Sequence, residues 1–155
     1  MTEFRNLRTT LVGDIAEDFI YAWLLTGQTV KMEYVYANYP IKSHPFDFYC
    51  LSADTENTKF LGDVKVKYPT YEGLMSIHLN DLKKYMKWAK KENCTFLLFY
   101  INYKTGDINA TTPQNILKSE VKRVQDDDKK WILYFNRWKK IGTVPQEICY
   151  KMKAV

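Results

Sequence analysis

The order of periodic segments along the chain constrains its fold most. Residues 10–25 repeat apolar side chains at three- and four-residue spacing, which is typical of an amphipathic helix. Three strand-like segments, a second helical pattern and a strongly apolar strand follow, at residues 30–36, 45–51, 59–67, 77–92 and 95–102. This α-β-β-β-α-β order predicts an α/β protein, in which a mixed sheet carries a helix on each face.

The last third of the chain is less regular. Its expected elements are a strand at 108–111, a short helix from Pro113 to Val124, a strand at 131–135 and an edge strand at 148–155. In the strand at 131–135, we expect Trp131, Leu133 and Phe135 to pack inward. Because 155 residues are too few for two ordinary domains, we expect one domain over residues 1–155. Its core would span residues 10–102, and residues 103–155 would be a C-terminal elaboration.

Composition excludes several classes of protein. Hydrophobic residues make up 46% of the chain and charged ones 26%, as in folded globular proteins and unlike disordered ones. No apolar run approaches the ~20 residues that a membrane helix needs. Cys50, Cys94 and Cys149 are an odd number without a CxxC pair, so we expect reduced thiols in a cytoplasmic protein. The net charge of +5 permits a polyanionic partner without proving one.

Only two histidines, His44 and His78, are present, so the chemistry of this chain must use carboxylates and lysines. Asp63 and Lys65 alternate with apolar residues in the third expected strand, and therefore share one of its faces. Buried charges of this kind are usually paired or bound to a metal. Asp47 on the neighbouring strand would lie roughly 5 Å from Asp63. Two carboxylates that close repel each other, and their oxygens suit Mg²⁺ or Mn²⁺.

These residues resemble a known pattern. The chain resembles the PD-(D/E)xK nuclease superfamily, whose motif is similar to Pro45-Phe46-Asp47 followed by Asp63-Val64-Lys65. Members of this superfamily, among them archaeal Holliday junction resolvases, have the restriction-endonuclease-like fold. The helix segment Gly13-Asp14-Ile15-Ala16-Glu17 also resembles the opening helix of resolvase-like members. Some members carry Gln-Leu-x-x-Tyr in the second helix, where this chain has Asp81-Leu82-Lys83-Lys84-Tyr85 and so departs at Asp81. The resemblance covers residues 10–102.

The resemblance implies a Mg²⁺-dependent endonuclease that hydrolyses phosphodiester bonds in DNA, including branched or single-stranded DNA. Glu17, Asp47, Asp63 and the Val64 carbonyl would hold the metal, Mg²⁺ or Mn²⁺, and Lys65 would orient the attacking water. A set of lysines is expected to contact the nucleic acid, namely Lys67, Lys83, Lys84 and Lys87. Since a duplex or junction needs two cuts, we also expect a homodimer. Its expected surface carries Trp131, Tyr134, Trp138 and Ile141.

Plainer interpretations of the same residues stay open. Asp63 and Lys65 can form an ordinary cross-strand ion pair, Glu17 can be a solvated helix residue, and lysine-rich helix faces are most often solvation surfaces. The chain can accordingly be a catalytically silent nuclease-fold module that binds nucleic acid or a protein. It can also be an interaction or inhibitor protein whose basic, aromatic surface binds an acidic protein. Mg²⁺-dependent cleavage would separate the first interpretation from the other two.

Overall fold

The structure is a computed structural model of the chain and describes residues 2–25, 34–36, 47–51 and 58–155. Its first part contains α1 (Thr2–Leu25), β1 (Tyr34–Tyr36), β2 (Phe48–Leu51), β3 (Thr58–Lys67), β4 (Met75–His78), α2 (Leu79–Glu92) and β5 (Thr95–Asn102). The remainder contains β6 (Asp107–Thr111), α3 (Pro113–Lys118), β7 (Glu120–Gln125), β8 (Trp131–Phe135), β9 (Lys139–Thr143) and α4 (Gln146–Ala154).

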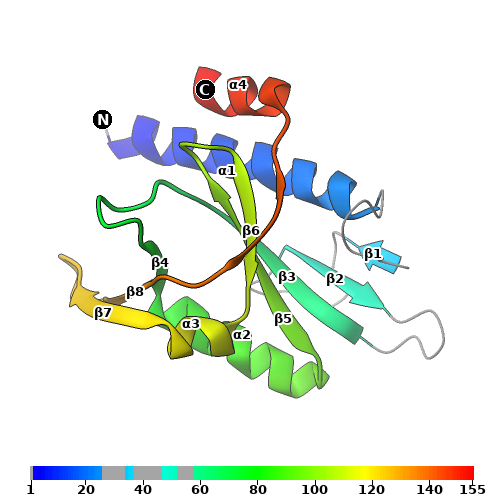
Figure 1. Cartoon of the computed structure of the whole chain (residues 1–155), viewed down its shortest axis with the longest axis vertical. Coiled ribbons are helices and arrows are strands. Elements are labelled where there is room, and N and C mark those ends of the chain that lie inside the picture. Colours follow the sequence, from blue (N-terminus) through cyan, green and yellow to red (C-terminus); the bar gives the residue numbers. More distant parts are fainter. Residues whose placement is uncertain (1, 26–33, 37–46, 52–57) are drawn as a thin grey trace.

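The predicted α/β fold class and the α-β-β-β-α-β core are confirmed. The main sheet has six strands in the order β1-β2-β3-β5-β6-β9. β3 and β5 run parallel and the other neighbours are antiparallel, so the sheet is mixed. Figure 1 shows α1 and α4 on one side of this sheet and α2 on the other. Of the predicted strand ends, residues 30–33 and 45–46 lie outside the described residues.

β5 lies between the two helix layers, which explains why its sequence is apolar almost throughout. Phe96, Leu98 and Tyr100 join a core cluster with α2. Phe99 and Ile101, on the opposite face, join a second cluster with α1 and α4. Because successive side chains of a strand point to opposite faces, a strand covered on both sides must be apolar at every position.

The two helices on the faces of the sheet bury regular stripes. Ala16, Ile20 and Leu24 of α1 follow one another at four-residue spacing and are 0%, 0% and 1% exposed. α2 buries Leu82 and Tyr85 against the other face. The sequence also led us to expect Leu79 and Met86 in this stripe, and both are partly buried. Within the described ranges, no helix is long and apolar enough to cross a membrane.

The second helix begins later than predicted because residues 75–78 form β4. This strand pairs with β8, and β8 pairs with β7, in a separate three-stranded sheet beside α2. The predicted helix from Pro113 to Val124 is therefore wrong beyond Lys118. Asp126 explains the change, since its side chain accepts the backbone N–H groups of Asp128 and Lys130 and closes the β7–β8 hairpin.

Two further C-terminal predictions are wrong. The tail is the helix α4 instead of an edge strand, and the edge of the main sheet is β9, which the sequence did not suggest. Trp131 is 44% exposed, although Leu133 and Phe135 of the same strand are fully buried as expected. Trp131 lies at the first position of β8, beyond the part of the strand that α2 covers with its buried residues.

Candidate active site

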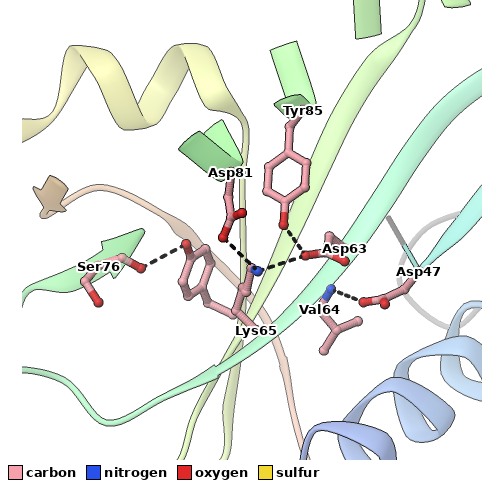
Figure 2. Close-up of polar contacts among 8 residues, drawn as sticks. Asp47, Asp63, Val64, Lys65, Ser76, Asp81 and Tyr85 are labelled. Carbon is pink, nitrogen blue, oxygen red and sulfur yellow. Dashed lines mark hydrogen bonds and ion pairs between the residues drawn. The ribbon is translucent and has the colours of Figure 1, made fainter. Parts of the chain in front are cut away.

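Asp47 lies where β2 begins and reaches across to β3. Its backbone N–H donates to the carbonyl of Gly62 over 2.9 Å, and its Oδ2 accepts the backbone N–H of Val64 over 2.7 Å. The described pairing of β2 with β3 ends at Phe48 opposite Gly62. The Asp47 carboxylate thus takes the place of a strand partner for Val64, and this hydrogen bond holds the Asp47 side chain against β3 (Figure 2).

Asp63 is the most buried charged residue of the site, with 5% of its surface exposed. The Tyr85 hydroxyl of α2 donates to its Oδ2 over 2.5 Å, and the Lys65 ammonium lies 3.2 Å from the same oxygen. Tyr85 is itself fixed by a stacked contact with Phe96, with ring centroids 4.4 Å apart. Asp63 therefore shares the α2-facing side of β3 with Leu61, which is part of the apolar core. In these surroundings the Asp63 carboxyl group depends on its polar partners.

Lys65 lies between the sheet and α2. Its ammonium is 3.2 Å from Asp63 and 3.8 Å from Asp81 Oδ2, and it stands 5.6 Å from the centroid of the Tyr85 ring. Figure 2 shows Asp81 and Tyr85 approaching this lysine and Asp63 from the same helix. The Lys65 side chain is 24% exposed, so solvent and a bound molecule can both reach it.

Glu17 joins the two aspartates from the α1 side. Burial raises its pKa, a hydrogen bond with Asp47 lowers it in part, and the charge of Asp63 raises it further. Burial also raises the pKa of Asp47, against the lowering effect of hydrogen bonds with Asp63 and Val64. For Asp63, burial, the charge of Asp47 and the hydrogen bond between these two carboxyl groups raise the pKa to about 8. The three groups thus share an excess of negative charge.

The donor set fits a hard divalent cation in its chemistry, because three neighbouring carboxyl groups with raised pKa values would be stabilised by positive charge. Among the described residues, however, no three His, Cys, Asp or Glu side chains already stand in the arrangement of a metal site. One oxygen of each aspartate, Oδ2, accepts a hydrogen bond, from Val64 N–H in Asp47 and from the Tyr85 hydroxyl in Asp63.

Val64 and Lys67, the other predicted residues of β3, lie on either side of this cluster. In a strand, the N–H and C=O of one residue face the same edge, so the Val64 carbonyl faces the edge to which Asp47 is bonded. Its side chain packs toward α1, as the alternation predicted. Lys67 ends the strand, and burial lowers the pKa of its ammonium.

The three predicted lysines of α2 are exposed and point away from the sheet, as a solvated helix face also would. They are Lys83, Lys84 and Lys87. Of these, Lys84 lines a small hollow of about 210 Å³ together with Asp81 and Trp131, beside the cluster. His78 lines the same hollow, whereas His44 lies outside the described residues.

Sequence reasoning missed the role of α2 in the site. Tyr85 and Asp81 were noted only as part of a family element, yet Tyr85 bonds Asp63 and Asp81 approaches Lys65. One signal was present, because Tyr85 is a polar-tipped residue within the buried stripe of Leu82 and Ala89. A buried tyrosine hydroxyl usually has a hydrogen-bond partner, and the opposing strand offered Asp63.

Comparisons with known proteins bear on the fold. No protein-family model matches the chain, and no curated protein matches it. Among solved structures, D212, a nuclease from a fusselovirus, matches over 92% of this chain and 89% of its own, with 14% identity and a TM-score of 0.52. The chain thus has a nuclease-like fold, and the fold is all that an identity this low shows.

Proposed function

We propose that this protein is a metal-dependent nuclease that hydrolyses phosphodiester bonds in DNA. One observation carries the proposal: Glu17, Asp47 and Asp63 interact with one another beside β3, and Lys65 pairs with Asp63. The nuclease D212 has a similar fold, which supports the same reaction class. The net charge of +5 suits a polyanionic substrate.

Glu17, Asp47, Asp63 and the Val64 carbonyl would hold Mg²⁺ or Mn²⁺. When bound, such an ion neutralises phosphate charge and lowers the pKa of its water. The protein's own contribution is the arrangement of the ligands. Val64 N–H fixes the orientation of Asp47, and Tyr85 fixes that of Asp63, so that neither carboxylate has to be ordered during the reaction.

Lys65 is proposed to act on the substrate. Its ammonium, now paired with Asp63, would turn to the scissile phosphate, orient the attacking water and stabilise the negative charge that develops on the phosphoryl oxygens. Asp81 holds the amine near β3 in the absence of substrate. The reaction then needs no covalent intermediate on the protein.

Cleavage of DNA by the wild-type protein tests the proposal. We expect cleavage with Mg²⁺ or Mn²⁺ and none with EDTA. Asp47→Asn, Asp63→Asn and Lys65→Ala should each reduce cleavage by about a thousandfold or more, while the fold persists. Asp127→Asn and Lys153→Ala change the same residue types at exposed positions and serve as matched controls. Full activity of Lys65→Ala would contradict the role given to this lysine.

A second candidate is a catalytically silent module that keeps the fold and binds nucleic acid or a protein partner. The observation in its favour is that Asp63 pairs with Lys65 and no ready-made metal site exists in the described part of the chain. Mn²⁺ titration followed by calorimetry distinguishes the two. If the protein is an enzyme, the wild type should bind Mn²⁺ and Asp63→Asn should not. If it is a silent module, the wild type should bind DNA equally well with and without the ion.

A further inference from the structure

A cleft of about 390 Å³ runs between α1 and the end of β3, beside the proposed metal site. Its lining includes Arg8, Gly13, Lys65, Lys67, Tyr68 and Tyr103. Lys65 lines the cleft as well as the site, so the cleft is adjacent to the proposed metal site. None of the chemistry proposed above requires this space, and its lining combines cations with aromatic rings.

Gly13 is the least expected residue in the cleft. It lies in the middle of α1, where glycine is less favourable than alanine because its backbone loses more freedom on folding. Packing does not require it, since a Cβ built at Gly13 would have no atom within 4 Å. The missing side chain therefore leaves the wall of the cleft bare, and glycine is typical of places where a ligand approaches the backbone closely.

The lining of the cleft offers partners for the base and for the phosphate of a nucleotide. Tyr68 is 65% exposed, and its ring centroid lies 6.4 Å from that of Tyr103. Exposed rings of this kind stack on nucleic acid bases, whereas ammonium and guanidinium groups bind phosphates. On the α1 side, Arg8 lines the cleft and supplies such a cation. The Lys67 side chain instead shares the strand face of Lys65 and interacts with Asp81. Tyr71, which is fully exposed, follows along the same loop.

We propose that this cleft binds an unpaired nucleotide of the DNA strand next to the bond to be cut. The base lies against the bare helix at Gly13 and stacks on Tyr68, and the phosphate contacts Arg8. A base inside a duplex is paired and stacked on its neighbours, so its face cannot meet these rings. The substrate is therefore single-stranded DNA or a branch with unpaired nucleotides, and its position at the bond rests on the proposed nuclease function.

Filling the cleft tests this inference. Gly13→Leu adds a side chain to the bare wall, and Ala22→Leu adds the same bulk to an exposed position on the opposite side of α1. We expect Gly13→Leu to weaken the binding of a fluorescent single-stranded oligodeoxynucleotide in EDTA by about tenfold. Its melting temperature should equal or exceed that of the wild type, because leucine is the better helix former. Ala22→Leu should bind like the wild type.

A second pair of variants does not depend on the helix. Tyr68→Ala removes the exposed ring and should also weaken single-strand binding by about tenfold. Tyr150→Ala removes a ring that is similarly exposed, at 64%, on α4, and should leave binding unchanged. Wild-type protein should bind the single strand more tightly than a blunt duplex of the same sequence.

The outcomes separate this inference from the proposed function. The proposed role of the cleft is overturned if Gly13→Leu and Tyr68→Ala bind single-stranded DNA as tightly as the wild type. It is also overturned if the wild type binds single strand and duplex with equal affinity, even if the protein cleaves DNA. Loss of single-strand binding in both variants supports the cleft even if no metal ion produces cleavage, in which case the nuclease function fails alone. A wild-type protein that binds no DNA overturns both.

Discussion

Tyr85 is the residue on which the geometry of the site depends most. Its ring is held against Phe96, and its hydroxyl donates to Asp63. This hydrogen bond lowers the pKa of Asp63, while burial and the neighbouring Asp47 raise it. The tyrosine thus offsets part of the cost of placing a carboxylate on a buried strand.

Tyr85→Phe is expected to keep the fold and impair the site. Without the hydroxyl, the pKa of Asp63 rises further, so the acidic limb of the pH–rate profile should move to higher pH and cleavage at neutral pH should fall about tenfold. Tyr100→Phe is the matched control, because the Tyr100 hydroxyl donates to the Ser76 carbonyl. A profile shifted equally by both changes would contradict the positioning role of Tyr85.

The stability of the metal-free protein should depend on pH through Asp63. Its pKa is about 8 in the folded protein and near its usual 3.8 when unfolded, so the folded state holds a proton that the unfolded state has lost between these values. This contribution to stability is complete below about pH 4 and is lost as the pH rises through 8. In EDTA, denaturant unfolding of Asp63→Asn should vary less between pH 5 and pH 9 than that of the wild type. Asp127→Asn should behave like the wild type.

At the scale of the elements, α4 packs with α1, the helix that carries Glu17, on one face of the main sheet. It lies beside α1 (Figure 1), and its Met152 is 2% exposed within the cluster that contains Ala16 and Ile20. Val144 of the preceding loop joins the same cluster. The position of Glu17 therefore depends on a helix that comes almost 130 residues later in the chain.

Met152→Ala should lower the free energy of unfolding by about 2–5 kcal/mol, because it leaves a cavity between α4 and the sheet. The neighbouring exposed Lys153→Ala should change it by less than about 0.5 kcal/mol. Denaturant titration of both variants measures the difference. Equal stabilities would show that α4 contributes nothing to the core.

At the scale of the whole molecule, the number of sites per particle decides how many strands can be cut. One chain carries one candidate site, and we expect a homodimer so that two strands can be cut in one complex. Of the four residues predicted for its surface, Trp131 is well exposed, whereas Trp138 and Ile141 pack against two different core clusters. These two are thus poor candidates for a contact surface.

Light scattering should give twice the chain mass of 18.4 kDa for the wild type. If Trp131 lies in the contact, Trp131→Lys should give the mass of one chain and keep the melting temperature, since the side chain is 44% exposed. Tyr71→Lys changes another exposed ring and should stay dimeric. A wild-type protein with the mass of one chain at every concentration would rule out the dimer and favour single-strand cutting.

The sequence by itself determined the order of the core elements, and it named four residues of the candidate site, Glu17, Asp47, Asp63 and Lys65. Helix periodicity marked α1 and α2, and strand alternation predicted that Asp63 and Lys65 share a face opposite to Val64. The structure places α2 on the first face and α1 on the second. Such signals are local, because they arise from 3.6- and two-residue repeats within one element. The roles assigned to Glu17, Asp47, Asp63 and Lys65 stay predictions, although these residues do converge.

Only the tertiary structure decided where residues distant in sequence meet. β7 is a strand because β8 pairs with it, and the tail is a helix because Met152 finds a buried place beside α1. The bond from Tyr85 to Asp63 and the bare wall at Gly13 likewise depend on which elements face each other. Short segments have weak intrinsic preferences, so contacts made across the chain determine their structure and the surroundings of the site.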